Sequence, residues 1–278
     1  ASERTALMQD TRVLGCAVVA ALGLTCAGCG ADVSSAKDHG ARGEGGAGGA
    51  PPGGVPVTIQ LEHRVGGLPL GESMVDTPFT NAAGNAFGVT RLVYFLSDVT
   101  LTPRGGAPAV AAGAHYVDHE EPATREIELS LEEGVSELAS LTFTFGLPPE
   151  ANVSGAFVTA PESLMEWPES MGGGYHYMKL EGFWSHGDGE VVPFKAHSGA
   201  AGGTDYSVAV ELDAAGLVVE GDALHLRLVM NVEQWFEGPN LWDFRERFTP
   251  PMYGIMHDAA AQRSLQQNGA TVFSLEVP

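Results

Sequence analysis

Residues 90–101 read TRLVYFLSDVTL, a stretch rich in β-branched and aromatic side chains. Gly88 precedes it, and the turn-forming residues Pro103 to Gly106 follow it. Side chains of this kind favour extended backbone, and glycine and proline are typical of the turns that bound a strand. The stretch therefore predicts a long strand near the centre of a β fold.

Further segments on both sides have the same character. Val57, Ile59 and Leu61 alternate with polar residues, as on a strand with one buried face. Other predicted strands are 141–145, 175–184, 191–197, 206–212, 224–230 and 271–277. Helical signals are few: Ser130 to Glu133 has the spacing of a capping box, and 258–268 is a short amphipathic stretch. This pattern predicts an all-β fold, an antiparallel β-sandwich with one or two short helices.

The amino-terminal residues read as an export signal. Arg4 and Arg12 precede an apolar run over 13–24, which is too short to span a bilayer as a permanent helix. Small residues then lead to Cys29, as in a bacterial lipobox, although Cys26 stands where leucine is usual. We therefore expect a lipoprotein signal peptide over 1–28 and lipidation at Cys29. The alternative is an ordinary signal peptide cut near Ala27.

A tether and one domain follow. Residues 30–56 contain 9 glycines and 3 prolines, a composition typical of a flexible linker, so we assign 29–56 to a tether and 57–278 to the folded domain. All three cysteines precede residue 30, so the domain has neither a disulfide nor a thiolate metal site. The expected location is the periplasm or cell surface, as an outer-membrane lipoprotein that contacts the membrane through its lipid anchor only.

Charge restricts the partners. The chain has 35 acidic and 14 basic residues and a net charge of −21 at pH 7. Nucleic acid is excluded as a partner, because phosphate binding needs clustered lysine and arginine. A strongly negative protein instead attracts cations at long range. The sequence also lacks the G-x-S-x-G, H-E-x-x-H, Walker and Rossmann motifs, so we expect no enzymatic activity.

Histidines are the main candidates for a binding site. His63 continues the inward parity of the first strand, His176 opens a strand after three glycines, and His197 ends another strand. Neutral imidazole is a favoured ligand of copper and zinc, so these three residues are the predicted metal ligands. The alternative is that each is a lone structural or surface histidine. His225 alternates with leucines and should face solvent.

A second cation site is conceivable at His115 and His119. The two residues are four apart, so they share a face of either a helix or a strand, and they lie beside Asp118, Glu120 and Glu121. The competing interpretation, a solvated acidic loop, is favoured.

Several motifs, in order, resemble the MbnP-like family of exported copper-binding proteins, which are related to surface copper proteins of methanotrophs. Residues 91–101 resemble the family strand R-x-Y-[VL]-S-D-[VI]-x-L, and 141–149 (LTFTFGLPP) resemble its f-x-l-G-[VL]-P segment. The remaining matches are Trp167 with 173–182 (GGYHYMKLEG), 194–199 (FKAHSG, the family F-x-x-H-x-G) and 256–273 with Asn268. The order and spacing hold from about Val57 to the end.

The resemblance implies copper, about one ion per chain, and a role in copper acquisition, storage or delivery. It also implies a di-haem cytochrome c peroxidase-like partner that oxidises a tryptophan to kynurenine beside the metal, here Trp167 or Trp184. The chain departs from the family in lacking two cysteines and the W-x-W pair before the G-Y motif. The alternatives are a structural or carbohydrate-contacting surface β-sandwich whose tryptophans stack on sugars, and an electron-transfer partner of a haem peroxidase.

Overall fold

The computed structural model describes residues 54–71, 78–185 and 189–278, all within the compact unit Gly46–Pro278. The expected signal peptide over 1–28, Cys29 and residues 29–53 of the expected tether lie outside the described residues. Within the described ranges, no helix is both long and apolar enough to cross a membrane.

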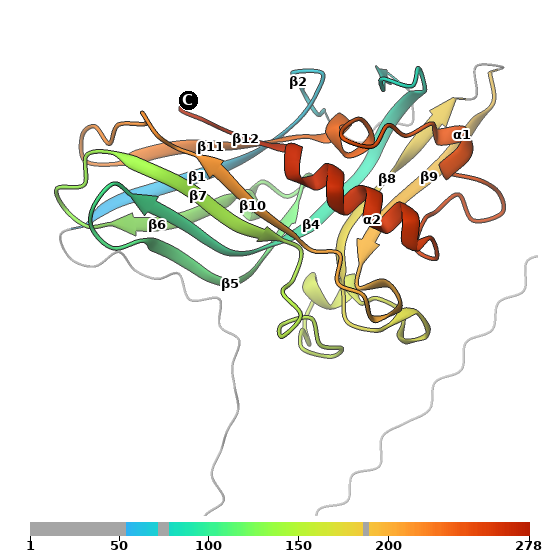
Figure 1. Ribbon diagram of the computed structural model, residues 1–278, viewed down its shortest axis with the longest axis horizontal. Coiled ribbons are helices and arrows are strands. Elements are labelled where there is room, and N and C mark those ends of the chain that lie inside the picture. Colours follow the sequence, from blue (N-terminus) through green and yellow to red (C-terminus); the bar gives the residue numbers. More distant parts are fainter. Residues whose placement is uncertain (1–53, 72–77, 186–188) are drawn as a thin grey trace, which may run out of the picture. The chain divides into compact units, whose positions relative to one another are not determined.

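Two β-sheets form the domain, which confirms the predicted β-sandwich (Figure 1). The five-stranded sheet contains β1 (Val55–Val65), β2 (Leu68–Pro69), β6 (Glu126–Leu131), β11 (Leu224–Asn231) and β12 (Phe273–Glu276). The seven-stranded sheet contains β3 (Phe79–Thr80), β4 (Ala86–Pro103), β5 (Ala109–Asp118), β7 (Leu138–Phe145), β8 (His176–Ser185), β9 (Val191–Gly199) and β10 (Val208–Asp213).

The helices are short, as predicted. They are α1 (Phe244–Arg247), α2 (Ala259–Asn268) and the 3-10 turns η1 (Pro122–Thr124), η2 (Glu162–Met165), η3 (Glu169–Met171), η4 (Ala201–Gly203), η5 (Val232–Phe236) and η6 (Gly269–Thr271). Asp258 caps α2 by accepting hydrogen bonds from the backbone amides of Ala260 and Ala261. The capping-box spacing at Ser130 does not start a helix: Ser130 lies in β6, because the alternation of Ile127, Leu129 and Leu131 pairs that segment with β1.

Strand β4, which contains the stretch 90–101, organises the larger sheet. Its first half pairs with β8 and its second half with β7, while β5 pairs with β4 over Val93 to Leu101. Tyr94 and Leu96 enter the main core, whereas Val93 and Phe95 enter a second cluster on the opposite face. Because both faces are covered here, β4 is continuously apolar from Leu92 to Leu96 and does not alternate in this part.

A bulge interrupts β4 at its Ser-Asp pair. The register shifts between Ser97 and Val99, and Asp98 has a φ of 54°, in the left-handed region that aspartate tolerates better than most residues. The Asp98 carboxylate accepts a hydrogen bond from the amide of Gly113 at 2.9 Å, and the Ser97 hydroxyl donates to the carbonyl of Gly146 at 2.8 Å. The Ser-Asp pair of β4 therefore has a structural role: its side chains link β4 to β5 and to the residue that follows β7.

Strand β1 has one parallel and one antiparallel neighbour, which its alternation alone does not predict. It pairs antiparallel with β6 but parallel with β11, in the register Val57 to Leu224. Among the named strands that the structure describes, this ladder is parallel and the others are antiparallel. Periodicity does not predict it, because periodicity reports which side chains are buried and not the direction of the neighbouring strand.

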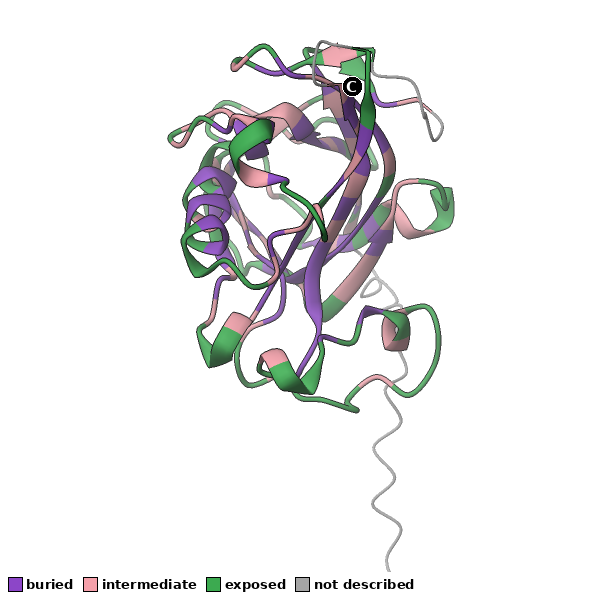
Figure 2. Cartoon of the chain, turned by 90° about the vertical axis from the view of Figure 1, so that its right-hand side faces the viewer, coloured by how far each residue is buried: buried purple, intermediate pink, exposed green. Residues whose placement is uncertain are grey.

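The main core lies between the two sheets. Figure 2 shows buried residues running along the strands, with exposed residues gathered in the connections. The second cluster lies on the outer face of the seven-stranded sheet, where Phe157 from the connection between β7 and β8 stacks on Phe95, and Met165 and Tyr175 belong to the same cluster. This connection also carries Trp167.

Candidate metal centres

His63 projects inward from β1, as its parity predicts, and is 2% exposed. Its Nε2 lies 2.9 Å from the hydroxyl of Tyr94 on β4. Its Nδ1 lies 3.0 Å from Nδ1 of His119, which directly follows the last residue of β5. Residues of both sheets therefore meet at this ring.

The hydrogen bonds fix the protons of the neutral pair. Nε2 of His119 must donate to the carbonyl of Gly71, 3.0 Å away, because a carbonyl only accepts. Nδ1 of His119 then carries a lone pair and accepts from Nδ1–H of His63, and Nε2 of His63 accepts from the Tyr94 hydroxyl. Every ring nitrogen of His63 and His119 therefore has a hydrogen-bond partner, in a chain that runs from the Tyr94 hydroxyl to the Gly71 carbonyl.

The same arrangement suits a metal ligand pair. Two imidazole nitrogens about 2.0–2.1 Å from one ion, at an angle of about 90–110°, lie about 2.9–3.4 Å apart. The 3.0 Å between the two Nδ1 atoms falls in that range. When both Nδ1 atoms bind a metal, Nε2–H of His63 donates to Tyr94 and Nε2–H of His119 donates to Gly71, the outer contacts typical of metal-bound histidine.

Electrostatics keep His63 neutral. Burial, then the neighbouring His119 and the Arg125 guanidinium, lower the pKa of His63 well below its usual value. A neutral imidazole offers its lone pair to a metal without first losing a charge-bearing proton.

A second histidine pair lies on adjacent strands of the larger sheet. His176 begins β8, His197 lies near the end of β9, and their ring centres are 5.1 Å apart at an angle of 83° between the planes. Both are nearly buried, with exposed fractions of 5% and 8%. Trp167 packs edge-on against His176, with 4.8 Å between ring centres.

Each ring of this pair has one nitrogen held by a neighbour. Nδ1–H of His176 donates to the carbonyl of Met165 at 2.9 Å. Nε2–H of His197 donates to a carboxylate oxygen of Glu181 at 2.8 Å. Burial lowers the pKa of His176 to about 3 and, against the opposing effect of Glu181, also lowers the pKa of His197. Both rings are therefore neutral near pH 7.

The three predicted ligands do not form one group. His176 and His197 meet, but His63 instead pairs with His119, a residue that the sequence favoured only as part of an acidic loop. No three His, Cys, Asp or Glu side chains in the described ranges are placed to hold one ion. Strand parity assigned His63 to the interior correctly, but parity does not specify which strand of the opposite sheet faces it.

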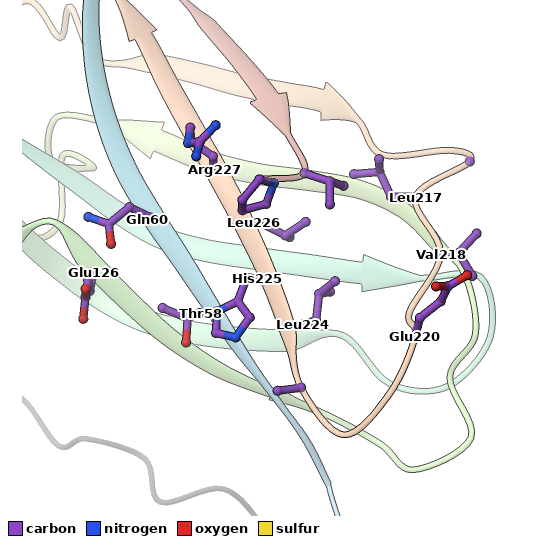
Figure 3. Close-up of a pocket in the computed structure, with 14 residues that line it drawn as sticks. Thr58, Gln60, Glu126, Leu217, Val218, Glu220, Leu224, His225, Leu226 and Arg227 are labelled. Carbon is purple, nitrogen blue, oxygen red and sulfur yellow. The ribbon is translucent and has the colours of Figure 1, made fainter. Parts of the chain in front are cut away.

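His115 and His225 belong to neither pair. His115 does not pair with His119: its Nε2–H donates to the carbonyl of Thr124 at 2.8 Å. His225 is exposed on β11, as predicted. It lines an open groove of about 980 Å³ on the outer face of β1 and β11, beside Thr58, Gln60 and Arg227 (Figure 3).

All four tryptophans of the chain are buried, each no more than 2% exposed. Trp184 lies in the main core, 6.0 Å from Phe244 between ring centres. Stacking on a sugar requires an exposed aromatic face, so the tryptophans provide no support for the carbohydrate-contacting alternative.

Comparisons with known proteins agree with this architecture. The family model described as MbnP matches residues 54–257. The solved structure of MbnP from Methylosinus trichosporium is similar with a TM-score of 0.50 and 13% sequence identity, over 81% of this chain and 99% of that one. At this identity the structural likeness shows the fold alone. No curated protein matches the chain.

Proposed function

Because the chain belongs to the MbnP family, we propose that it is an exported, lipid-anchored copper-binding protein that serves copper acquisition, storage or delivery. It turns over no substrate. Copper is its cargo, held by Nδ1 of His63 and Nδ1 of His119 as one ion per chain.

The 3.0 Å separation of these two nitrogens is the observation on which the proposal depends. In the metal-bound form that we propose, the proton of His63 moves from Nδ1 to Nε2, so that both Nδ1 lone pairs bind one ion while the opposite ring nitrogens donate to Tyr94 and Gly71. Imidazole suits copper, and Cu²⁺ has the highest affinity among the divalent first-row ions at a given nitrogen site.

The charge of the domain supports the delivery of cations to this pair. Residues 57–278 contain 30 acidic and 10 basic side chains, so the domain attracts cations without selecting among them. His119 is only partly buried and gives the pair a side open to solvent, whereas His63 anchors it in the core. Selectivity for copper then comes from the imidazoles.

The proposed partner is a di-haem cytochrome c peroxidase-like protein that oxidises one tryptophan. Of the two candidates, Trp167 belongs to a surface connection and packs against His176, which is outside the His63–His119 pair, whereas Trp184 lies in the main core. We therefore assign the modification to Trp167. A covalent mass increase confined to the Trp167 peptide, after coexpression with such a peroxidase, is the expected result.

Copper titration of the purified protein against a competing chelator tests the site. Losing either imidazole should weaken binding at least tenfold, since even altering a supporting group costs that much. His119→Ala is the cleaner variant because His119 is only partly buried, and His225→Ala on exposed β11 is the matched control. Equal copper affinity in His63→Ala, His119→Ala and His225→Ala, each with a native unfolding transition, would overturn the proposal.

A further inference from the structure

Arg125 directly precedes β6, two residues before Ile127 and four before Leu129, which are both buried in the main core. Its carbonyl accepts a hydrogen bond from the backbone amide of Leu61 at 2.8 Å, which carries the contact between β1 and β6 past the last pair of their ladder. The side chain of Arg125 is partly buried. A guanidinium group therefore lies at one end of the core, beside β1.

This position brings the guanidinium close to the proposed copper pair. Leu61 and His63 share the inward face of β1, so His63 is a diagonal neighbour of residue 125, within reach of a long side chain. Burial, then His119 and then the positive charge of Arg125 lower the pKa of His63. Burial raises the pKa of Tyr94, and the same positive charge opposes that rise. The guanidinium thus acts electrostatically on both residues.

One donor of this guanidinium has no acceptor. Nε of Arg125 is buried without a hydrogen-bond partner, and no carboxylate in the ranges 54–71, 78–185 and 189–278 forms an ion pair with it. By contrast, Arg64 and Arg227 of the same sheet share Glu62 and Glu276. Buried polar atoms are nearly always paired, and a charge taken out of water is costly without a counter-charge. An anionic acceptor would satisfy this donor.

A metal ion on the pair makes an anion more favourable still. In the described part of the chain, an ion between His63 and His119 has no third His, Cys, Asp or Glu ligand, so its remaining positions are open to other donors. The positive charge of Arg125 opposes such an ion unless a negative group lies between them. A guanidinium binds a planar oxyanion through two parallel hydrogen bonds, and the anion can offer another oxygen to the metal.

We propose that Arg125 and the His63–His119 pair form one site that takes a metal ion together with a small planar oxyanion, bicarbonate or carbonate. This site rests on the proposed function, since its metal is the copper of that pair. Nε–H of Arg125 and a terminal N–H of the same group donate to the anion, and an anion oxygen completes the copper coordination. Anion and metal therefore bind with positive cooperativity, each raising the affinity of the other by the same factor.

Copper titration of the full chain, with free copper set by a chelator and with or without bicarbonate at equal ionic strength, tests this coupling. Bicarbonate should tighten copper binding to the wild type about tenfold or more, the value of a hydrogen bond to a charged group. Arg125→Gln should abolish this dependence. Without bicarbonate, the variant should bind copper more tightly than the wild type, because a repelling charge is gone. A variant that merely loses structure would not reverse the order of the affinities.

Arg104→Gln is the matched control for the loss of one positive charge. Arg104 follows the end of β4, and it and its partner Glu137 have side chains that are more than half exposed. This variant should keep the wild-type copper affinity in both buffers. A bicarbonate dependence that disappears equally in Arg104→Gln and Arg125→Gln would show an effect of net charge and overturn the anion site.

Nitrogen NMR of the arginine side chains tests the anion contact without copper. In the metal-free wild type, bicarbonate should shift the Nε–H signal of Arg125, which is identified by its loss in Arg125→Gln, and leave that of Arg104 in place. Copper binding that is independent of bicarbonate, with an unshifted Arg125 signal, would overturn the anion site and leave the copper pair intact. Absence of copper binding in both buffers would instead overturn the proposed function, and the Arg125 signal would still decide whether the anion binds.

Discussion

His63 and His119 lie with their Nδ1 atoms 3.0 Å apart although β1 and β5 belong to different sheets of the sandwich. The backbone amide of His119 donates to the carbonyl of Leu92 at 3.0 Å, which holds the end of β5 against β4. Tyr94 of the same β4 contacts the other side of the His63 ring. One strand of the larger sheet thus positions both the second histidine and the hydroxyl that orients the first.

Tyr94→Phe should weaken copper binding about tenfold, because the hydroxyl is the outer contact that orients His63. It should also lower the free energy of unfolding by about 1–3 kcal/mol, since Nε2 of His63 is left buried without a partner. Chelator competition and chemical denaturation measure the two effects.

Tyr116→Phe is the matched control for this prediction. Its hydroxyl donates to Asp118 at 3.3 Å on the same strand that leads to His119, without touching either proposed ligand. Copper affinity should be unchanged. Equal affinities in Tyr94→Phe and Tyr116→Phe would show that the hydroxyl does not support the site.

The stability of the metal-free domain should fall as the pH drops below about 6.5, the unfolded pKa of histidine. Burial lowers the folded pKa of His176 to about 3, so between these values the unfolded chain binds a proton that the folded chain does not. Stability contributed by the neutral ring is therefore present above pH 6.5 and lost toward pH 3, at about 1.4 kcal/mol per pH unit for this residue. Urea denaturation at pH 7, 6 and 5 measures the slope.

The variant His176→Phe identifies the source of that slope. His63 and His197 also have lowered pKa values through burial, so the variant should reduce the pH dependence without abolishing it. The same change at exposed His225 should leave the slope as in the wild type. If His176→Phe has the wild-type slope, the proton uptake belongs elsewhere.

The sequence predicted the sandwich because strand periodicity is a local property. Val57, Ile59 and Leu61 are all buried, and the stretch around Tyr94 is the central strand of its sheet. The parallel ladder of β1 with β11 was not predictable in this way, since each strand would look the same beside an antiparallel neighbour. The capping-box spacing at Ser130 did not produce a helix, because its segment forms β6 and pairs with β1, a long-range contact that the spacing does not report.

In the candidate metal centres too, the features set by local periodicity were predictable and those set by long-range packing were not. Strand parity correctly placed His63 in the interior. His176 and His197 lie on β8 and β9, which follow one another in the sequence and pair in the sheet, and this pairing brings the two rings together. His119 was considered only together with His115, and its pairing with His63 was not predicted, because His119 follows β5 in a turn, where no periodicity reports the direction of a side chain. Only the packing of the two sheets decides that it meets His63.

Gly199→Ala should displace Trp167 and destabilise the domain by about 1–3 kcal/mol, the usual cost of overpacking. A Cβ at this position would lie 2.6 Å from the Trp167 ring, which is itself held against His176. Tryptophan fluorescence and thermal unfolding report the displacement. Gly254→Ala, whose Cβ would meet Lys195 at an ordinary 3.5 Å, is the control and should be nearly neutral.

Cys29→Ser should release the protein from the membrane fraction in a soluble form, because the acylated cysteine is the only membrane contact that we propose. A cysteine carrying more than one acyl chain anchors stably, whereas one chain binds marginally and reversibly, so partial lipidation should already move some of the protein from the membrane fraction to the soluble fraction.

Fractionation of cells that express the full precursor, with Cys26→Ser as the matched control, separates the lipobox from an ordinary signal peptide cut near Ala27. Membrane association that persists in Cys29→Ser would refute the lipid anchor, and release of Cys26→Ser as well would point to a role of the signal sequence rather than acylation at Cys29.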